Sequence, residues 1–168
     1  MSQTLPEEIY IESVGPAYAE VLEALHALAF HRPGDETWTA RSFSDVLNSP
    51  GSFCLIARPT EPEGAEPCGF SACRVRSGSA ELLSLGVSPR HQRLGIAQEL
   101  ISASMHQCHS LGATEMFLEV AKDNPNAQQL YGALGFEAVG ERKGYYRRLD
   151  EKRVDAITMR ILLGDVLD

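Results

Sequence analysis

The stretch from residue 82 to 100, LLSLGVSPRHQRLGIAQEL, contains the residues best suited to binding a charged ligand. Gly95 and Ala97 stand where a strand-like run gives way to a long segment with helical apolar spacing. The first turn of a helix has unpaired backbone N–H groups and a positive dipole end, so it binds phosphate well. Gly95 also has no side chain to keep a ligand from the backbone. The pattern is not a Walker A loop, and helix–strand packing explains its small residues about as well.

The cysteines and histidines do not indicate a metal or redox site. The cysteine spacings contain no C-x-x-C and no zinc-finger arrangement. We therefore expect Cys54 and Cys73 to be small core residues, and we expect no bound metal. The five histidines are scattered, and we expect them on the surface or in packing. The cysteines in question are Cys54, Cys68, Cys73 and Cys108.

The elements that must position this segment follow from hydrophobic periodicity. The order is β-α-α-β-β-β-α-β-α-β-β, and only the strand–helix–strand unit from 82 to 120 needs a parallel crossover. This order predicts an α/β (α+β mixed) domain spanning 1–168, with helices on the faces of a mixed sheet. We expect strands at 8–14, 53–58, 68–76, 80–87, 115–120, 136–140 and 154–162. We expect helices at 17–30, from 39 or 42 onward, at 94–111 and at 124–134.

Composition excludes several classes of function. The net charge of −8 and the pI near 5.1 make nucleic-acid binding unexpected. The apolar runs are far shorter than the roughly 20 residues of a membrane span. The first residues, MSQTLPEEIYIES, do not resemble a signal peptide, so we expect a cytoplasmic protein that binds no membrane. The basic segment 142–153 is interpreted as a solvated hairpin, or as a loop that contacts a substrate.

Two motifs in order carry a family resemblance. The pattern Q-x-x-G-x-A at 92–97, between V-x-P and a long helix, resembles the acetyl-CoA motif of the GNAT superfamily. The stretch 118–136, LEVAKDNPNAQQLYGALGF, resembles the second signature of that superfamily. Within it, L-E-V, Y-Y and D-A-I-T-M are similar to the ribosomal-protein alanine N-acetyltransferases. The resemblance covers about 53–162, and it departs at Ala121, where many members have arginine, and at Val154, where an acid is common.

The resemblance implies a GNAT fold and a set of residues that bind acetyl-CoA. Six to seven mostly antiparallel strands would be flanked by about four helices, and a splayed pair of strands would hold the ligand. The N–H of Val87 would face the thioester oxygen as an oxyanion donor. Asn124 would bind the ligand, cap a helix, or do both. The implied ligand-binding residues are Leu85, Gly86, Val87, Gln92, Arg93, Leu94, Gly95, Ile96, Ala97, Gln98, Asn124 and Ala127.

The resemblance also implies two catalytic residues. Glu119 would be the general base, on a strand face shared with Phe117 and Ala121. We expect that partly apolar face to raise the pKa of the carboxyl; the alternative is a surface glutamate. Tyr131 would protonate the departing thiolate, and helix packing is its alternative role. Tyr145 and Tyr146 would line an acceptor channel, whereas we expect Trp38 to pack.

The expected function is acetyl transfer from acetyl-CoA to an amine by direct attack. The first hypothesis for the acceptor is a protein N-terminus, such as the alanine of a ribosomal protein. The alternatives are a small-molecule amine, and a non-catalytic acyl-CoA sensor. The sequence does not distinguish a monomer from a homodimer.

Overall fold

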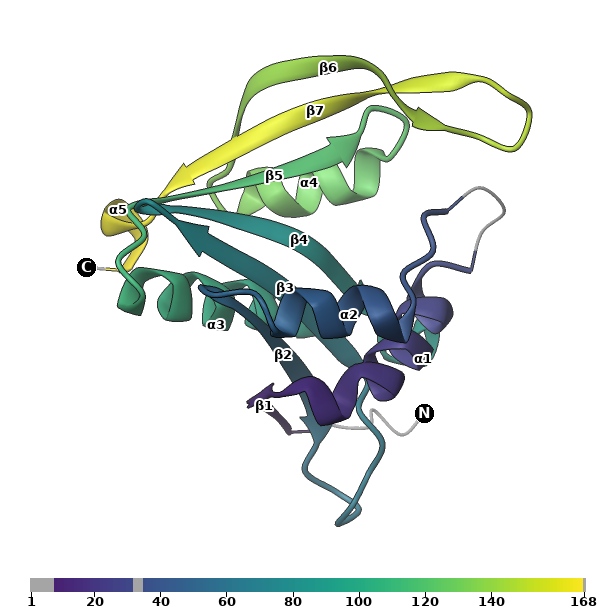
Figure 1. Ribbon diagram of the computed structural model, residues 1–168, viewed down its shortest axis with the longest axis vertical. Helices are drawn as coiled ribbons and strands as arrows, with labels where there is room; N and C mark the ends of the chain where they lie inside the picture. The colour runs from purple at the N-terminus through teal and green to yellow at the C-terminus, as the bar shows by residue number, and fades with distance from the viewer. Residues whose placement is uncertain (1–7, 32–34, 168) are drawn as a thin grey trace, which may run out of the picture.

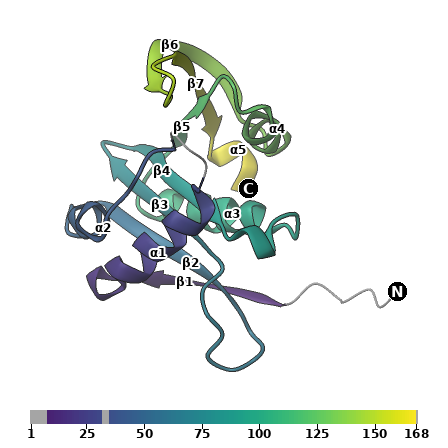
Figure 2. The ribbon, with the colours of Figure 1, turned by 90° about the vertical axis from the view of Figure 1, so that its right-hand side faces the viewer.

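The computed structural model describes residues 8–31 and 35–167, which form one seven-stranded sheet with helices on both faces (Figures 1 and 2). The strand order in the sheet is β1-β2-β3-β4-β5-β7-β6. The strands are β1 (Ile9–Val14), β2 (Ser52–Pro59), β3 (Gly69–Arg76), β4 (Ser79–Val87), β5 (Glu115–Ala121), β6 (Glu137–Arg147) and β7 (Arg153–Leu162). The helices are α1 (Ala19–Ala29), α2 (Ala40–Leu47), α3 (Ile96–Ser110), α4 (Pro125–Ala133) and the short α5 (Gly164–Leu167), besides 3-10 turns at Pro16–Tyr18 and Pro89–His91.

The pairing of β4 with β5 is the one parallel pairing in this sheet, and it is short. Ser79 to Glu81 pair with Glu115 to Phe117, and every other strand pair is antiparallel. The pairing of β3 with β4 is irregular beside Ala72, where Leu83 is an extra residue on β4. Such a bulge bends its strand. Beyond Glu81 the two strands therefore diverge, and Figure 1 shows the opening between them. The predicted mixed sheet with a splayed pair is confirmed.

Two hydrophobic clusters hold the helices on the sheet. On one face, α1 and α2 bury Leu22 and Phe43 against Ile56 and Phe70. On the other face, α3 buries Leu100 and its neighbours against β2, β3 and β4. Figure 2 shows α1 and α2 on the face opposite α3. All four cysteines are buried, including Cys54 and Cys73, which were expected in the core.

The β6–β7 hairpin differs from the expectation. The strand predicted at 136–140 extends to Arg147, so the segment expected as a loop is largely strand. Its register is irregular between Arg142 and Tyr146, and nearly all of β6 is solvent-exposed. An exposed strand at a sheet edge lacks the apolar alternation that marks a half-buried strand, which explains why the sequence pattern missed it. The solvated hairpin itself is confirmed.

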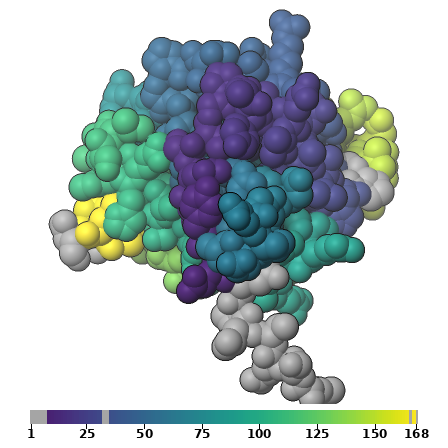
Figure 3. Space-filling model, turned by 90° about the horizontal axis from the view of Figure 1, so that it is seen from below, coloured from purple at the N-terminus to yellow at the C-terminus, as the bar shows by residue number. Residues whose placement is uncertain are grey.

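β1 forms the edge of the sheet opposite β6. Figure 3 views this side, where β1 lies beside the segment that joins β2 to β3. Among the described residues, no helix is long and apolar enough to cross a membrane.

Candidate active site

The turn before α3 has the geometry expected of an anion site. Gly95 has a φ of 83°, a left-handed conformation that L side chains rarely adopt, and it forms the N-cap of α3. Its carbonyl accepts the N–H of Glu99, which is the first bond of the helix. The three N–H groups before Glu99 therefore have no acceptor within the helix. Arg93, Leu94 and Gln98 are exposed around this turn, whereas the side chain of Ile96 is buried in the core.

Replacing Gly95 with alanine is expected to weaken acetyl-CoA binding by up to about tenfold. An alanine in the left-handed conformation costs about 1–2 kcal/mol. The exposed turn is therefore expected to shift to another backbone conformation, which does not bind the ligand. No atom lies within 4 Å of the added Cβ, so a direct clash plays no part. Gly112→Ala is the matched control, because Gly112 has a φ of 92° and equally open surroundings at the far end of α3. Calorimetric titration that gives equal affinities for the two variants would contradict this role of Gly95.

The end of β4 presents a free backbone edge to the opening. The N–H of Ser88 donates to the carbonyl of Cys68 on the side of β3. Because N–H directions alternate along a strand, the N–H of Val87 points to the opposite side, away from β3. The Gln92 side chain donates to the carbonyl of Val87 at 3.2 Å. Gln92, predicted to bind the ligand, thus ties the turn before α3 to the edge of β4.

Gly86 has a structural reason to be glycine. A Cβ at this position would lie 2.7 Å from the Cβ of Ala29 and 2.8 Å from a ring carbon of Phe70. The ring of Phe30 would lie at 3.2 Å. Gly86 therefore lets the end of α1 approach β4, while Leu85 packs on the opposite face of the sheet.

We expect Gly86→Ala to destabilise the fold by about 1–3 kcal/mol, the usual cost of overpacking. Chemical denaturation measures this directly. Gly132→Ala in α4 is the control, since no atom lies within 4 Å of its added Cβ and alanine favours a helix interior. Equal stabilities of the two variants would show that the end of α1 moves to accommodate the added methyl group without a cost in stability.

The start of α4 is held beside the end of β5. The Asn124 side chain accepts the N–H of Ala127 at 3.2 Å, which confirms the predicted N-cap. The Gln128 amide donates to the carbonyls of Ala121, Lys122 and Asn124. The sequence analysis missed Gln128, whose bonds fix the turn between the strand and the helix.

A cavity of about 220 Å³ occupies the opening between β4 and β5. It brings together six predicted site residues, including Glu119 and Tyr131, with residues that the sequence analysis did not assign. The Gly95 turn and Val87 are not part of this lining. The lining residues are His26, Phe30, Asp35, Glu36, Trp38, Leu82, Leu83, Ser84, Leu85, Leu118, Glu119, Val120, Ala121, Asn124, Ala127, Tyr131, Tyr146 and Arg148. We call this space the transfer cavity.

Glu119 is an ion-paired carboxylate at the wall of the transfer cavity. Its oxygen lies 2.8 Å from Nε of Arg142 on β6, and its side chain is 21% exposed. The guanidinium of Arg142 also stacks over the ring of Tyr145 at 5.4 Å. The partly apolar strand face that carries Phe117 and Ala121 is thus complemented by a cation from another strand, which contacts the carboxylate. No sequence signal pointed to Arg142, which is 23 positions away in the irregular part of β6.

Tyr131 presents a protonated phenol to the transfer cavity. Burial raises its pKa above the usual value near 10, with smaller contributions from Tyr146 and Cys73. Its ring packs edge-on against Phe136 at 5.7 Å. The raised pKa keeps the phenol protonated but makes it a weaker acid, so it can protonate a departing thiolate only through a direct hydrogen bond; the ring also has a packing role.

The two tyrosines of β6 flank the carboxylate in different ways. Tyr146 lines the transfer cavity, and burial, followed by the charge of Glu119, raises its pKa to about 12. Tyr145 is half exposed outside the cavity lining, in edge contact with Tyr146. Arg148 stacks on Tyr146 and forms two bonds with Asp123 at 3.1 and 2.6 Å.

An aromatic floor from α1 and α2 completes the cavity. His26 is 3% exposed and stacks on Phe30 at 4.4 Å, which places it in packing. Burial lowers its pKa, so it is neutral at physiological pH. Trp38 packs against Phe43 at 5.0 Å, as expected, and also lines the cavity.

Comparison with known proteins decides the family. The model of the acetyltransferase (GNAT) family matches residues 19–136. The chain belongs to the GNAT acetyltransferase family. It is 33% identical over 118 residues to the [ribosomal protein bS18]-alanine N-acetyltransferase of Haemophilus ducreyi, covering 70% of this chain and 80% of that one. It is 31% identical to the N-alpha-acetyltransferase RimI of Mycobacterium tuberculosis, over 95% of this chain and 96% of that one.

Solved structures share the fold of this GNAT chain. The ribosomal-protein-S18-alanine N-acetyltransferase of Escherichia coli matches with a TM-score of 0.80 at 23% identity, covering 93% and 94% of the two chains. Arabidopsis thaliana NAA60 in complex with acetyl-CoA matches with a TM-score of 0.79 at 21% identity, covering 94% and 99%. The predicted GNAT fold and acetyl-CoA-dependent N-acetyltransferase activity are confirmed. Among the described residues, no group of three or more His, Cys, Asp or Glu side chains is arranged to hold a metal ion.

Proposed function

We propose that this GNAT acetyltransferase acetylates the N-terminal α-amine of a polypeptide, with the N-terminal alanine of a ribosomal protein as the first candidate. The relatives at 31% and 33% identity are named for acetylation of an α-amine or an N-terminal alanine. The observation that carries the proposal is that Glu119 and Tyr131 line the same transfer cavity. The cytoplasmic location and the oligomeric state remain predictions.

The residues around the opening fit the two ends of acetyl-CoA. The free N–H groups after Gly95, with Arg93 exposed beside them, would hold the pyrophosphate. The edge of β4 at Leu85 and Val87 would pair with the pantetheine arm. The N–H of Val87 would donate to the thioester oxygen. Acetyl-CoA supplies the activated acyl group, and the protein supplies its position.

The proton chemistry is assigned to two side chains. Glu119 would accept the proton that the amine loses as its nitrogen bonds to the acetyl carbon. Tyr131 would donate a proton to the sulfur as the carbon–sulfur bond breaks. An α-amine has a pKa near 8 and a lysine amine near 10.4. At neutral pH the uncharged fraction is therefore more than about a hundred times larger for the α-amine. One carboxylate therefore suffices for an α-amine.

Direct attack is favoured over an acyl-enzyme. Burial raises the pKa of Cys54 to about 12. The pKa of Cys73 is also raised, by its contact with Cys108 and by burial. A buried thiol that stays protonated is a poor nucleophile, and no cysteine lines the transfer cavity.

The test is release of free thiol from acetyl-CoA with three classes of acceptor. An alanine-starting peptide is expected to react faster than an Nα-blocked peptide that contains lysine. Faster reaction of the blocked peptide would contradict the proposal. Turnover only with small amines such as polyamines would identify a small-molecule enzyme, and acetyl-CoA binding without any turnover would indicate a sensor.

A further inference from the structure

A second cavity, of about 320 Å³, begins at the catalytic carboxylate and leads away from the transfer cavity. The two cavities share Leu118 and Glu119, so the carboxylate lies where they meet. This second space, which we call the arginine groove, is lined by Arg74, Arg76, Ser79, Ala80, Glu81, Phe117, Leu118, Glu119, Arg142 and Thr158.

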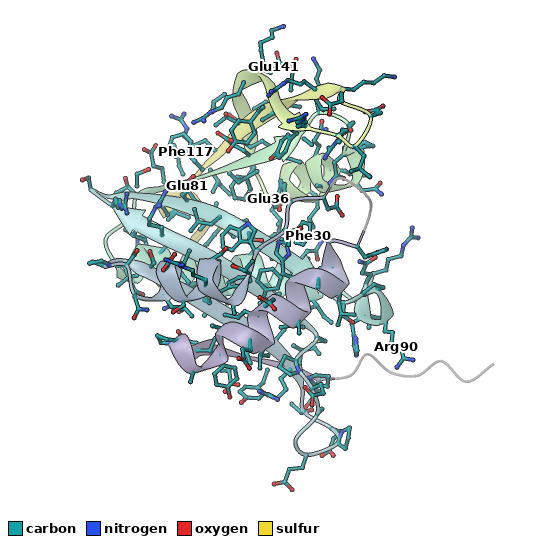
Figure 4. The ribbon with its side chains drawn as sticks, turned by 45° about the vertical axis from the view of Figure 1, so that its right-hand side comes forward. Phe30, Glu36, Glu81, Arg90, Phe117 and Glu141 are labelled. Carbon is teal, nitrogen blue, oxygen red and sulfur yellow. The ribbon has the colours of Figure 1, made fainter. Side chains whose placement is uncertain are left out.

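The register of the sheet shows that the groove crosses one face of the strands. Arg74 pairs with Glu81, and Glu81 pairs with Phe117 on the next strand. Paired residues in a sheet, and residues two apart in a strand, share a face. Phe117 and Glu119 therefore lie on the face of Arg74. Figure 4 shows Glu81 and Phe117 close together, and also Phe30 and Glu36, which line the transfer cavity.

The groove has more positive than negative charge available to a ligand. The guanidinium of Arg74 is bonded to Glu81 at 2.7 Å. Arg142 is paired with Glu119, the residue that would bind the incoming amine. Arg76 is exposed and has no acidic partner among the residues that the structure describes. An amine that engages Glu119 would leave two uncompensated guanidinium groups, those of Arg76 and Arg142.

We propose that the arginine groove binds the part of the acceptor polypeptide that follows the acetylated residue, and that it prefers aspartate or glutamate there. The inference rests on the proposed function, because it needs an acceptor with a chain beyond its amine. Half-buried Phe117 and the backbone of β4 form the floor on which an extended segment would lie. Arg76, together with Arg142 once an amine engages Glu119, favours carboxylate side chains, which guanidinium groups bind through paired hydrogen bonds.

The spacing of the strands predicts which acceptor positions matter. Arg74 lies two strands across and two residues back from Glu119, which corresponds to about 12 Å at the usual sheet spacings. An extended chain covers about 3.3–3.6 Å per residue, so the third to fifth residues of the acceptor reach the guanidinium groups of Arg74 and Arg76.

The experiment compares peptides of one sequence that start with alanine and carry two aspartates, two lysines or two serines at positions three to five. Wild type is expected to give kcat/KM for the aspartate peptide about three- to tenfold above that for the lysine peptide, as expected for a few solvent-exposed ion pairs. Arg76→Glu is expected to abolish or reverse this ratio. Arg41→Glu is the matched control, since Arg41 is exposed on α2, lines neither cavity, and changes the net charge equally.

The outcomes distinguish a failure of the arginine-groove proposal from a failure of the proposed function. The net charge of −8 favours lysine peptides at long range, so a preference for aspartate requires the local arginines. Good turnover of all three peptides with no effect of Arg76→Glu would overturn the groove and leave N-terminal acetylation intact. A preference for the lysine peptide that disappears in Glu36→Gln would also overturn the arginine-groove proposal. The acceptor chain would then extend from Glu119 along Glu36 instead of along the arginines. Absence of turnover with every peptide would overturn both.

Discussion

Glu119→Gln is expected to lower kcat for an alanine-starting peptide by about 10²–10⁴, the usual contribution of a general base. Glutamine keeps the size of the side chain and can still contact Arg142, but it cannot accept a proton from the amine. The affinity for acetyl-CoA should be unchanged, because the Gly95 turn and the edge of β4 are not altered. Thiol release under saturating acetyl-CoA, together with calorimetric titration, measures the two effects separately.

The control for this variant is Glu115→Gln. Glu115 lies on the same strand and the same face, but its carboxylate faces Arg160 at 4.0 Å and lines neither cavity. It should retain wild-type turnover. If Glu119→Gln also retained more than about a third of the wild-type kcat, the amine would reach the acetyl group already neutral and the base assignment would be wrong.

Tyr131→Phe should lower kcat about 10²-fold with little change in stability. Phenylalanine keeps the ring that packs on Phe136, so only the hydroxyl is lost. The thiol of CoA has an ordinary pKa near 8.5, below that of the phenol, so the phenol can donate to the thiolate only within direct hydrogen-bond reach. Tyr10→Phe, on the distant β1, is the matched control and should leave kcat unchanged.

The pH profile separates an acid from a packing residue. The folded pKa of Tyr131 is raised, so the phenol is protonated below that pKa and would lose its donor function only above it. Wild-type kcat/KM should therefore rise as an α-amine of pKa near 8 loses its proton, and should show no fall up to about pH 10. If kcat of Tyr131→Phe equalled that of wild type, the tyrosine would be a packing residue.

Features carried by neighbouring residues could be predicted from the sequence. The helix start near Gly95, the capping Asn124 and the order of strands and helices depend on short patterns, because helix ends and strand periodicity are set within a few residues. The motif at 92–97 indicated where a helix begins and what its first turn binds. Glu119 and Tyr131 were found through the family pattern, and the fold brings both to one cavity.

The surroundings of these residues were decided by tertiary structure. Arg142 reaches Glu119 across β7, through a strand whose register is irregular, and no local pattern encodes such a register. Gly86 is required by the approach of Ala29, Phe30 and Phe70, which are distant in sequence. The sequence by itself determined the fold, the reaction class and the catalytic candidates. Tertiary structure alone decided the charge beside the base and the groove that leads from it, because contacts between distant residues depend on how strands pair and helices pack.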